Sequence, residues 1–555
     1  MLHALTGGSA ARTASRSGLV VLSPLARALI LLAGACSQPV PVAPAAATAP
    51  AAPADTAVLT QRGDATRVGW NRHETVLNQA NVGRIGLRIT YPLDGAVYAQ
   101  PLFVPGLGGH NAVIVATEHG SVYALDADAK GTARAPLWQR SLLPYGAKPV
   151  SASDDVKCES ISPEVGITST PVIDPATNTM YVVATMHDTT GIVDRMYALD
   201  VASGKDKLPP VTLSATVNGS NSDNGKVRFD AAYEQQRVGL LLQGGVVYAA
   251  FSSYCSRMPY QGWILGYQAK DLRQAVVYTD NPDQGSSGKR PGGGGIWQSQ
   301  TGLVGYQGSI FVTTGNGPYN LNTPGGRNSG MSLLRLVRDG GGLKVADAFT
   351  PFNVTCLNDH DQDLSSGAPL LLVDQGEVVE ISKEGRIELA KIDSLGGFHT
   401  IDQPCDHQDR TDVDQIVQEL PIQTVDGGVW GAETTWTGGG KTFVYTAGVA
   451  DKLTAWQLVD GKLVSTPSSQ AAEGLAYPGG IPVVSSNGDA PGSAVVWIVG
   501  NEDGGPVLRA YDPTDLRHEL VHEKLAGYTN FTVPTVAAGR VVVGTQHAVV
   551  IYGPL

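Results

Sequence analysis

One pattern of strands recurs eight times along this chain of 555 residues and constrains the fold more than any other feature. Each unit begins with small or polar residues, often including a proline, and continues into a short apolar strand. A turn and a second, β-branched strand follow, and a third strand ends near Ala-Leu-Asp or a variant of it. The eight first strands are predicted at 99–104, 169–173, 237–242, 300–304, 367–372, 431–435, 480–484 and 531–535.

The third strands keep the same register, as the segments 122–126 and 196–200 illustrate. Helical periodicity is absent over any window long enough to indicate a helix. Units of four strands that repeat at this spacing are typical of a β-propeller. The last unit ends after its third strand, at 548–552, and we expect segment 84–95 to supply the missing outer strand, with 84–90 as its core.

The predicted fold is therefore all-β: an eight-bladed β-propeller of four-stranded antiparallel blades, whose ring is closed by an N-terminal strand. Two separate β-sandwiches are the alternative, although sandwiches do not repeat a unit this regularly.

The N-terminus has the features of an export signal. Residues 1–35 contain three arginines and no acidic residue, and the apolar run 28–32 is followed by small residues before Cys36. We interpret residues 1–35 as a signal peptide. The segment 32–36 resembles a bacterial lipobox, which predicts a lipid on Cys36; ordinary signal cleavage before Cys36 is the competing interpretation.

The domain organisation follows from composition. Residues 36–68 begin with an Ala/Pro-rich stretch that lacks periodicity, and we interpret this segment as a tether. Residues 69–555 are predicted to form one propeller domain. The expected location is the periplasmic face of a bacterial outer membrane, as a lipoprotein, or else the periplasm or the medium as a soluble protein.

The charge balance excludes one class of partner. Without the three arginines of residues 1–35, 36 of the 39 basic residues remain against 51 acidic residues, which is a net charge of −15. This balance argues against nucleic acid as a partner and against an anionic membrane surface. Contact with a membrane is expected only through the lipid at Cys36.

Four cysteines remain after Cys36, and an exported chain with an even number of cysteines favours two disulfides. We predict pairs between Cys158 and Cys255 and between Cys356 and Cys405, because each pair would join loops of neighbouring repeats. A zinc site is the alternative, but no C-x-x-C spacing is present.

Polar residues that could form a site gather in two sets of loops. In a four-stranded blade, the loop before the first strand and the loop between the second and third strands open on the same face. The first set contains Glu164, the glycine run 292–295 with Trp297, and the acidic segment 358–363. The second set contains Asp188, Asn316 and Lys383. Carboxylates, an amide oxygen and a lysine on one face could bind a hard cation beside a fixed positive charge.

These residues resemble those of the pyrroloquinoline quinone (PQQ)-dependent alcohol dehydrogenases and the wider class of quinoprotein-like eight-bladed propellers, including exported PQQ-like lipoproteins. The resemblance covers the chain from about Gly69 to Leu555. It rests on the blade-end motif 197–204 and on the segments 98–101, 166–174 and 295–298.

The resemblance implies a role for each of five residues. Trp297 would form the floor on which the flat quinone stacks, and Asn316 would be a calcium ligand. Asp361 would bind calcium and act as the base, with Asp363 as its neighbour. Lys383 would contact the quinone oxygens. PQQ and calcium are the implied cofactors.

Two further residues complete the predicted set, and the sequence also departs from the family. We assign Glu164 to the cofactor pocket and Asp188 to the metal. Family enzymes have two adjacent, disulfide-linked cysteines above the quinone, whereas this chain has Cys158 followed by Glu159. No C-x-x-C-H haem motif is present, so electrons would pass to a separate acceptor.

Each site residue also has a purely structural interpretation. Trp297 could pack within a blade, Asn316 could support a turn, the acidic loop could be solvated, and Lys383 could lie on the surface. Two functions from different classes therefore stay open. One is a PQQ- and calcium-dependent dehydrogenase that oxidises an alcohol or sugar hydroxyl. The alternative is a non-catalytic, outer-membrane-anchored propeller that binds a periplasmic or outer-membrane protein as an assembly scaffold; a polysaccharide-cleaving propeller is a third class.

Overall fold

The computed structural model describes residues 52–222, 224–283 and 293–555, so the predicted signal peptide, Cys36 and Gly292 lie outside the described residues. Within these ranges the chain is almost entirely strand. The described helices are one short α-helix, α1 (Val354–Asp359), and the 3-10 turns η1 (Ala54–Thr56), η2 (Val82–Arg84), η3 (Gln298–Gln300), η4 (Leu364–Ser366), η5 (Val373–Gln375) and η6 (Pro404–His407). None of these described helices has the length and apolar character needed to cross a bilayer.

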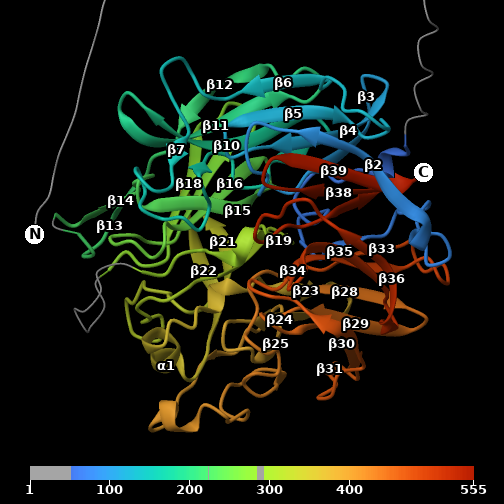
Figure 1. Cartoon of the computed structure of the whole chain (residues 1–555). Coiled ribbons are helices and arrows are strands. Elements are labelled where there is room, and N and C mark those ends of the chain that lie inside the picture. Colours follow the sequence, from blue (N-terminus) through green and yellow to red (C-terminus); the bar gives the residue numbers. More distant parts are fainter. Residues whose placement is uncertain (1–51, 223, 284–292) are drawn as a thin grey trace, which may run out of the picture. The chain divides into compact units, whose positions relative to one another are not determined.

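Most strands belong to antiparallel sheets in which consecutive strands are neighbours (Figure 1). The first two sheets contain β3 (Leu102–Leu107), β4 (His110–Ala116), β5 (Ser121–Asp126) and β6 (Trp138–Ser141), then β9 (Val172–Asp174), β10 (Thr179–Asp188), β11 (Gly191–Asp200) and β12 (Asp206–Thr212).

The next sheet has nine strands. Two four-stranded groups are joined by a parallel pairing of Val277 with Gly342, and β26 adds a ninth strand by pairing with β22. Its strands are β15 (Glu234–Gln243), β16 (Val246–Ser253), β17 (Trp263–Gln268), β18 (Gln274–Thr279), β19 (Val304–Tyr306), β20 (Ser309–Thr313), β21 (Leu333–Asp339), β22 (Gly342–Thr350) and β26 (Gly397–Phe398).

Two further sheets complete the middle of the chain. They contain β23 (Leu370–Leu372), β24 (Glu377–Ile381), β25 (Ile387–Lys391) and β27 (Gln418–Glu419), then β28 (Thr434–Gly438), β29 (Lys441–Thr446), β30 (Lys452–Val459), β31 (Lys462–Leu463) and β32 (Ser469–Gly474).

The last two sheets each include a strand from the N-terminal part of the chain. They contain β1 (Trp70–Asn71) with β33 (Val483–Ser485), β34 (Val495–Glu502), β35 (Gly505–Asp512) and β36 (Asp515–Lys524), then β2 (Ile85–Pro92) with β37 (Thr535–Ala537), β38 (Arg540–Gly544) and β39 (Ala548–Pro554). Two small ribbons pair β7 (Val150–Ser151) with β8 (Glu164–Val165) and β13 (Thr216–Asn218) with β14 (Lys226–Arg228).

Each of the eight predicted first strands overlaps the first strand of a four-stranded group. In five of them the ladder begins directly after a proline, because proline has no N–H to donate and cannot sit inside a central strand. The prolines are Pro101, Pro171, Pro369, Pro482 and Pro534, before β3, β9, β23, β33 and β37.

The N-terminal strand β2 pairs antiparallel with β39, from Ile85 opposite Pro554 to Pro92 opposite Ala548. In Figure 1 the blue β2 lies beside the red β39. The pairing predicted for this segment is therefore present. Ile89 is 1% exposed in the core that β2 shares with β39, whereas Leu87 on the same strand is 52% exposed.

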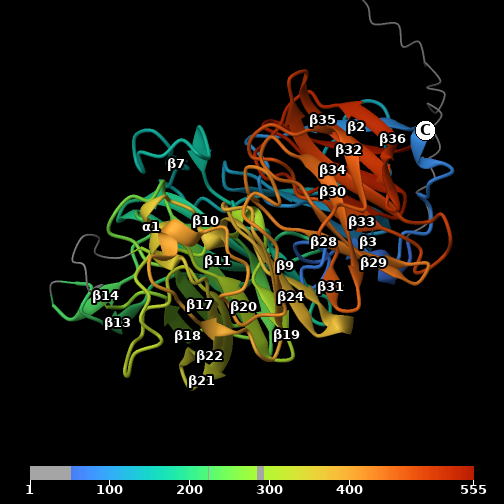
Figure 2. The same ribbon diagram turned by 90° about the horizontal axis from the view of Figure 1, so that it is seen from below.

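Apolar side chains on the faces of neighbouring sheets form the core. Val495 and Trp497 of β34, for example, pack in one cluster with Val541 and Val543 of β38. Figure 2 shows the sheets of β30 and β34 next to each other, and their facing residues share another cluster. Burial of apolar area between sheets is the main stabilising contribution in such a fold.

Both predicted disulfides are confirmed: Cys158 bonds to Cys255, and Cys356 bonds to Cys405. The first joins a loop before β9 to the loop after β16, in neighbouring strand groups as expected. The second joins α1 to η6, on either side of β23, β24 and β25, so it ties together two loops around the same sheet.

Residues 60–67 form a loop that is buried at both ends, at 60–62 and at Arg67, and that contacts several sheets. Arg62 donates to the main-chain oxygens of Glu433 and Pro482. Arg67 donates to those of Leu240 and Leu303. The boundary between tether and domain at residue 69 stays a prediction. Through the hydrogen bonds of Arg62 and Arg67, the loop just before this boundary is held against the sheets.

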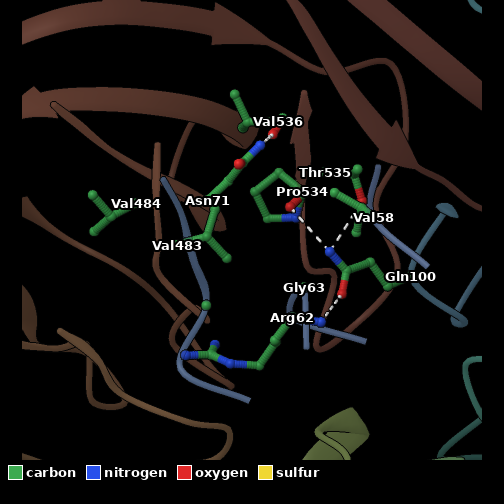
Figure 3. Close-up of a pocket in the computed structure, with 11 residues that line it drawn as sticks. Val58, Arg62, Gly63, Asn71, Gln100, Val483, Val484, Pro534, Thr535 and Val536 are labelled. Carbon is green, nitrogen blue, oxygen red and sulfur yellow. Dashed lines mark hydrogen bonds between the residues drawn. The ribbon is translucent and has the colours of Figure 1, made fainter. Parts of the chain in front are cut away.

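Gln100 fixes the same loop from the other side. Its Oε1 accepts from the Arg62 amide at 2.7 Å, and its Nε2 donates to Thr535 Oγ1 at 3.0 Å (Figure 3). Together with Val58 and Val536, these residues line a pocket of about 30 Å³. The space is enough for little more than one water molecule, so we interpret it as a packing feature.

We expect Arg62→Met to lower the free energy of unfolding by at least about 3 kcal/mol, because several buried carbonyl groups would lose their donor. Arg84→Met is the matched control, since Arg84 is exposed, and should change stability by less than about 0.5 kcal/mol. Urea denaturation measures both values. Similar losses for the two variants would contradict the role given to residues 60–67.

We expect Ile89→Ala to lower the free energy of unfolding by about 2–5 kcal/mol, because it leaves a cavity between the sheet that contains β2 and the neighbouring sheet of β3, β4 and β5. Leu87→Ala, on the exposed side of the same strand, should cost less than about 0.5 kcal/mol. The same urea measurement applies. An Ile89→Ala variant as stable as Leu87→Ala would mean that β2 is not packed as described.

Candidate functional site

The turn after β20 meets the acidic loop after α1. The Asn316 amide N–H donates to Asp363 Oδ1 at 2.7 Å, and Asn316 Nδ2 donates to Asp361 Oδ1 at 2.5 Å. Asp363 is 6% exposed, whereas the Asp361 side chain is 72% exposed. Asp361 has φ of 57°, a left-handed conformation that few residues other than glycine adopt. The chain thus presents one buried and one accessible carboxylate side by side.

Lys383, in the turn after β24, provides the positive charge. Its Nζ lies 2.6 Å from Asp363 Oδ2, 3.4 Å from Asp361 Oδ2 and 3.0 Å from the Asp361 main-chain oxygen. Burial raises the pKa of Asp363, and Lys383 acts in the opposite direction. Burial lowers the pKa of Lys383, but Asp363 and Asp361 outweigh burial and hold it above its ordinary value. Lys383 is therefore protonated.

Positions 293–295, near Asn316 and Asp363, require glycine for two reasons. Gly293, Gly294 and Gly295 all have positive φ, between 85° and 102°. A Cβ on Gly294 would lie 2.1 Å from Asp280 Oδ2, which also accepts a hydrogen bond from the Gly295 amide at 2.9 Å. The first strand predicted at 300–304 begins four residues later than expected. Residues 298–300 have positive φ and form η3, and the strand β19 begins only at Val304.

Trp297 lies next to the carboxylates. Its amide N–H donates to Ser365 Oγ at 2.8 Å, two residues beyond Asp363. A Cβ on Gly315 would lie 2.4 Å from Asp363 Oδ1 and 2.9 Å from Trp297 Cδ1, so only glycine fits between them. The Trp297 side chain is half-buried.

Two buried residues contact the Trp297 ring. The Tyr260 ring meets it edge-on, with centroids 6.3 Å apart, and the Arg237 guanidinium lies 5.9 Å from its centroid. Burial raises the pKa of Tyr260, with a further contribution from Asp363. Burial lowers the pKa of Arg237 to about 10, which leaves it charged at neutral pH. Neither residue was predicted from sequence.

A cavity of about 1040 Å³ opens beside the acidic loop. Its lining combines aromatic and apolar side chains with Asn316, Asp361 and Asn358, which is the composition of many small-molecule sites. Trp297 and Lys383 are not among the lining residues. Lining residues to which the sequence assigned no role in the site include Cys255, Met258, Tyr260, Tyr319, Asn358 and Phe398.

Only Asn358 among these carried a usable signal, as part of the acidic segment. Its Oδ1 accepts from the Gly317 amide at 2.8 Å. Cys255, which is bonded to Cys158, itself lines the cavity. The disulfide thus borders the cavity, although the two cysteines are not adjacent in sequence.

Glu164 and Asp188 lie apart from this group. Glu164 Oε2 is 2.8 Å from His119 Nδ1, and Asp188 forms an ion pair of 2.5 Å with Arg195. Neither residue lines the cavity formed by the described residues. The assignment of Glu164 to the cofactor and of Asp188 to the metal stays a prediction. The other predicted residues lie together: Asn316, Asp361, Asp363 and Lys383 contact one another, and Trp297 lies beside them.

The donor set fits a hard cation. Asn316 Oδ1 is buried and has no hydrogen-bond partner in the described structure, and the two neighbouring carboxylates offer further oxygen ligands. An amide oxygen with carboxylates is a ligand set typical of calcium. Lys383 already compensates part of the negative charge, so a cation would share the carboxylates with its ammonium group.

No family model matches the chain, and no curated protein matches it. Solved structures do. The quinohemoprotein alcohol dehydrogenase from Comamonas testosteroni is 16% identical, with a TM-score of 0.59 over 90% of this chain and 80% of that chain. Quinohemoprotein alcohol dehydrogenase ADHIIG from Pseudomonas putida HK5 is 12% identical, with a TM-score of 0.58 over 90% of this chain and 80% of that chain. A europium-containing methanol dehydrogenase is 13% identical, with a TM-score of 0.56 over 90% of this chain and 98% of that chain. At these identities the likeness shows the fold alone, which is a β-propeller as in these dehydrogenases.

Proposed function

We propose that this protein is an exported, quinoprotein-like dehydrogenase that uses PQQ and calcium to oxidise an alcohol or sugar hydroxyl. The observation that carries the proposal is the convergence of Asn316, Asp361, Asp363 and Lys383, with Trp297 alongside, next to a large cavity that Asn316 and Asp361 line. The shared fold with quinohemoprotein alcohol dehydrogenases supports it.

The proposal includes a finer account of the architecture. The strand groups that begin at β3, β9, β15, β19, β23, β28, β33 and β37 would be the eight blades. β2 would close the ring as the outer strand of the last blade. The propeller domain would span residues 69–555, with residues 60–67 packed against it.

We assign a role in cofactor binding to each of these residues. Asn316 Oδ1, Asp361 and Asp363 would hold calcium, and the half-buried ring of Trp297 would contact the face of the quinone. Lys383 would lie close enough to bind quinone oxygens. When bound, PQQ supplies the redox chemistry and calcium polarises it as a Lewis acid.

The protein's own contribution is binding and proton transfer. Asp361 is the accessible carboxylate of the group, so it would accept the proton of the substrate hydroxyl. Asp363 is buried and paired with Lys383, so it holds the lysine in place and is not itself the base. Aromatic lining residues Tyr319 and Phe398 would contact the carbon skeleton of the substrate and exclude water.

The proposed partners and location follow from the same assignment. A separate electron acceptor would reoxidise the cofactor. The protein would act at the periplasmic face of the outer membrane, anchored through Cys36, or in soluble form in the periplasm. A non-catalytic scaffold that binds another envelope protein is the alternative if the cavity binds no quinone.

We expect the calcium-loaded protein to bind PQQ with a dissociation constant below tens of micromolar, which corresponds to about −6 kcal/mol or tighter. Trp297→Ala should weaken binding because it removes an aromatic contact surface, and Asp361→Ala should abolish the calcium dependence. The measurement is a titration followed by quinone absorbance, together with a dye-linked assay on alcohols and sugars.

Glu473→Gln is the control for these variants, because it removes an exposed carboxylate outside the cavity lining. It should bind as the unchanged protein does. The absence of saturable PQQ binding at tens of micromolar would refute the dehydrogenase and leave the scaffold.

A further inference from the structure

A second group of carboxylates lies at the outer edge of the sheet that contains β24. Glu388 on β25 and Glu419 on β27 stand directly opposite each other, and Asp414 comes from the loop before β27. One oxygen from each lies within 4.8 Å of the other two. The residues are only 4%, 8% and 9% exposed. Like charges directly opposite each other on paired strands are destabilising, so this arrangement needs a compensating group.

Three oxygens of this cluster have no partner. Glu388 Oε2, Asp414 Oδ1 and Glu419 Oε2 are buried and accept no hydrogen bond in the described structure. The other oxygens are partly used: Asp414 Oδ2 accepts from the Phe352 amide at 3.2 Å, and Glu419 Oε1 accepts from Arg386 at 3.1 Å. A buried carboxylate oxygen without a donor costs several kcal/mol of free energy.

The protein supplies one positive charge to this cluster. Arg386 is shared between Glu419 and Glu384, at 3.1 Å from each. Four carboxylates beside one guanidinium leave three negative charges when all are ionised.

We propose that Glu388, Asp414 and Glu419 bind a hard divalent cation, with calcium as the fitting ion. Three carboxylates offer three to six oxygen ligands. One oxygen of each lies within 4.8 Å of the other two, and each residue has a buried oxygen without a partner, which supports an ion bound between them. Magnesium usually keeps several of its waters, whereas these oxygens are shielded from solvent, and calcium accepts such an all-protein set more readily. The site is distinct from Asn316 and the large cavity.

The cation would stabilise the loop that carries Asp414. This loop includes Cys405, which is bonded to Cys356 in α1, and α1 leads directly into Asp361. Arg386 also donates to the main-chain oxygens of Gln408 and Arg410 in the same loop. The ion would therefore hold the outer side of the segment that forms one wall of the cavity.

The test is calcium titration calorimetry on the full chain. We expect calcium to bind at this site in the Asp361→Ala variant as well, because that substitution removes a ligand of the other proposed site only. Asp414→Asn and Glu419→Gln should each weaken this binding about tenfold or more. Glu473→Gln, at an exposed position, should leave it unchanged.

Thermal unfolding of Asp361→Ala provides a second measurement that does not depend on the folding of the cluster variants. A chelator should lower its Tm, and added calcium should restore it. The proposal is overturned if Asp361→Ala binds no calcium, if Asp414→Asn and Glu419→Gln both bind it unchanged, or if the chelator has no effect. None of these results depends on whether PQQ binds.

Discussion

Two buried arginines in one loop hold the starts of separate sheets at fixed distances. A guanidinium has five N–H donors in a rigid plane, so one side chain can bind several carbonyl groups at once. Arg62 reaches the segments before β28 and β33, and Arg67 reaches β15 and the segment before β19. Burial lowers the pKa of both to about 10, so both remain charged at neutral pH.

This loop also contacts the segment beneath the site. Gln61 Nε2 donates to the Gln300 main-chain oxygen at 3.2 Å, and its Oε1 accepts from the Gly302 amide at 3.1 Å. Both residues follow Trp297 closely, and Gln300 ends the stretch with positive φ. The position of Trp297 therefore depends on a segment far away in sequence, as well as on Ser365 beside the acidic loop.

The strand repeat could be predicted because each first strand has a local signal, which is often a proline immediately before the ladder. The pairing of β2 with β39 could be predicted because the final unit lacks a strand. The conformation of residues 298–300 could not, since Gln and Ser carry no preference for positive φ that would reveal it. The burial of Arg62 and Arg67 could not be predicted either, because an arginine side chain is normally exposed.

In the site, Asn316, the acidic loop and Lys383 were identifiable, since each carries its chemistry in a short segment. Tyr260 and Arg237 were not, because their contacts with Trp297 arise only from the packing of neighbouring sheets. Glu388 and Glu419 resemble solvent-facing strand residues in the sequence, and only the three-dimensional structure shows that Asp414 covers them.

The pairing of β2 with β39 has a consequence for biosynthesis. Nearly the whole chain separates the two strands, and such a non-local contact forms slowly because a long loop must close first. During translation β2 would leave the ribosome long before its partner exists. Until β39 is made, the edge of β2 is open to pairing with other chains, a state in which a chaperone would have a clear role.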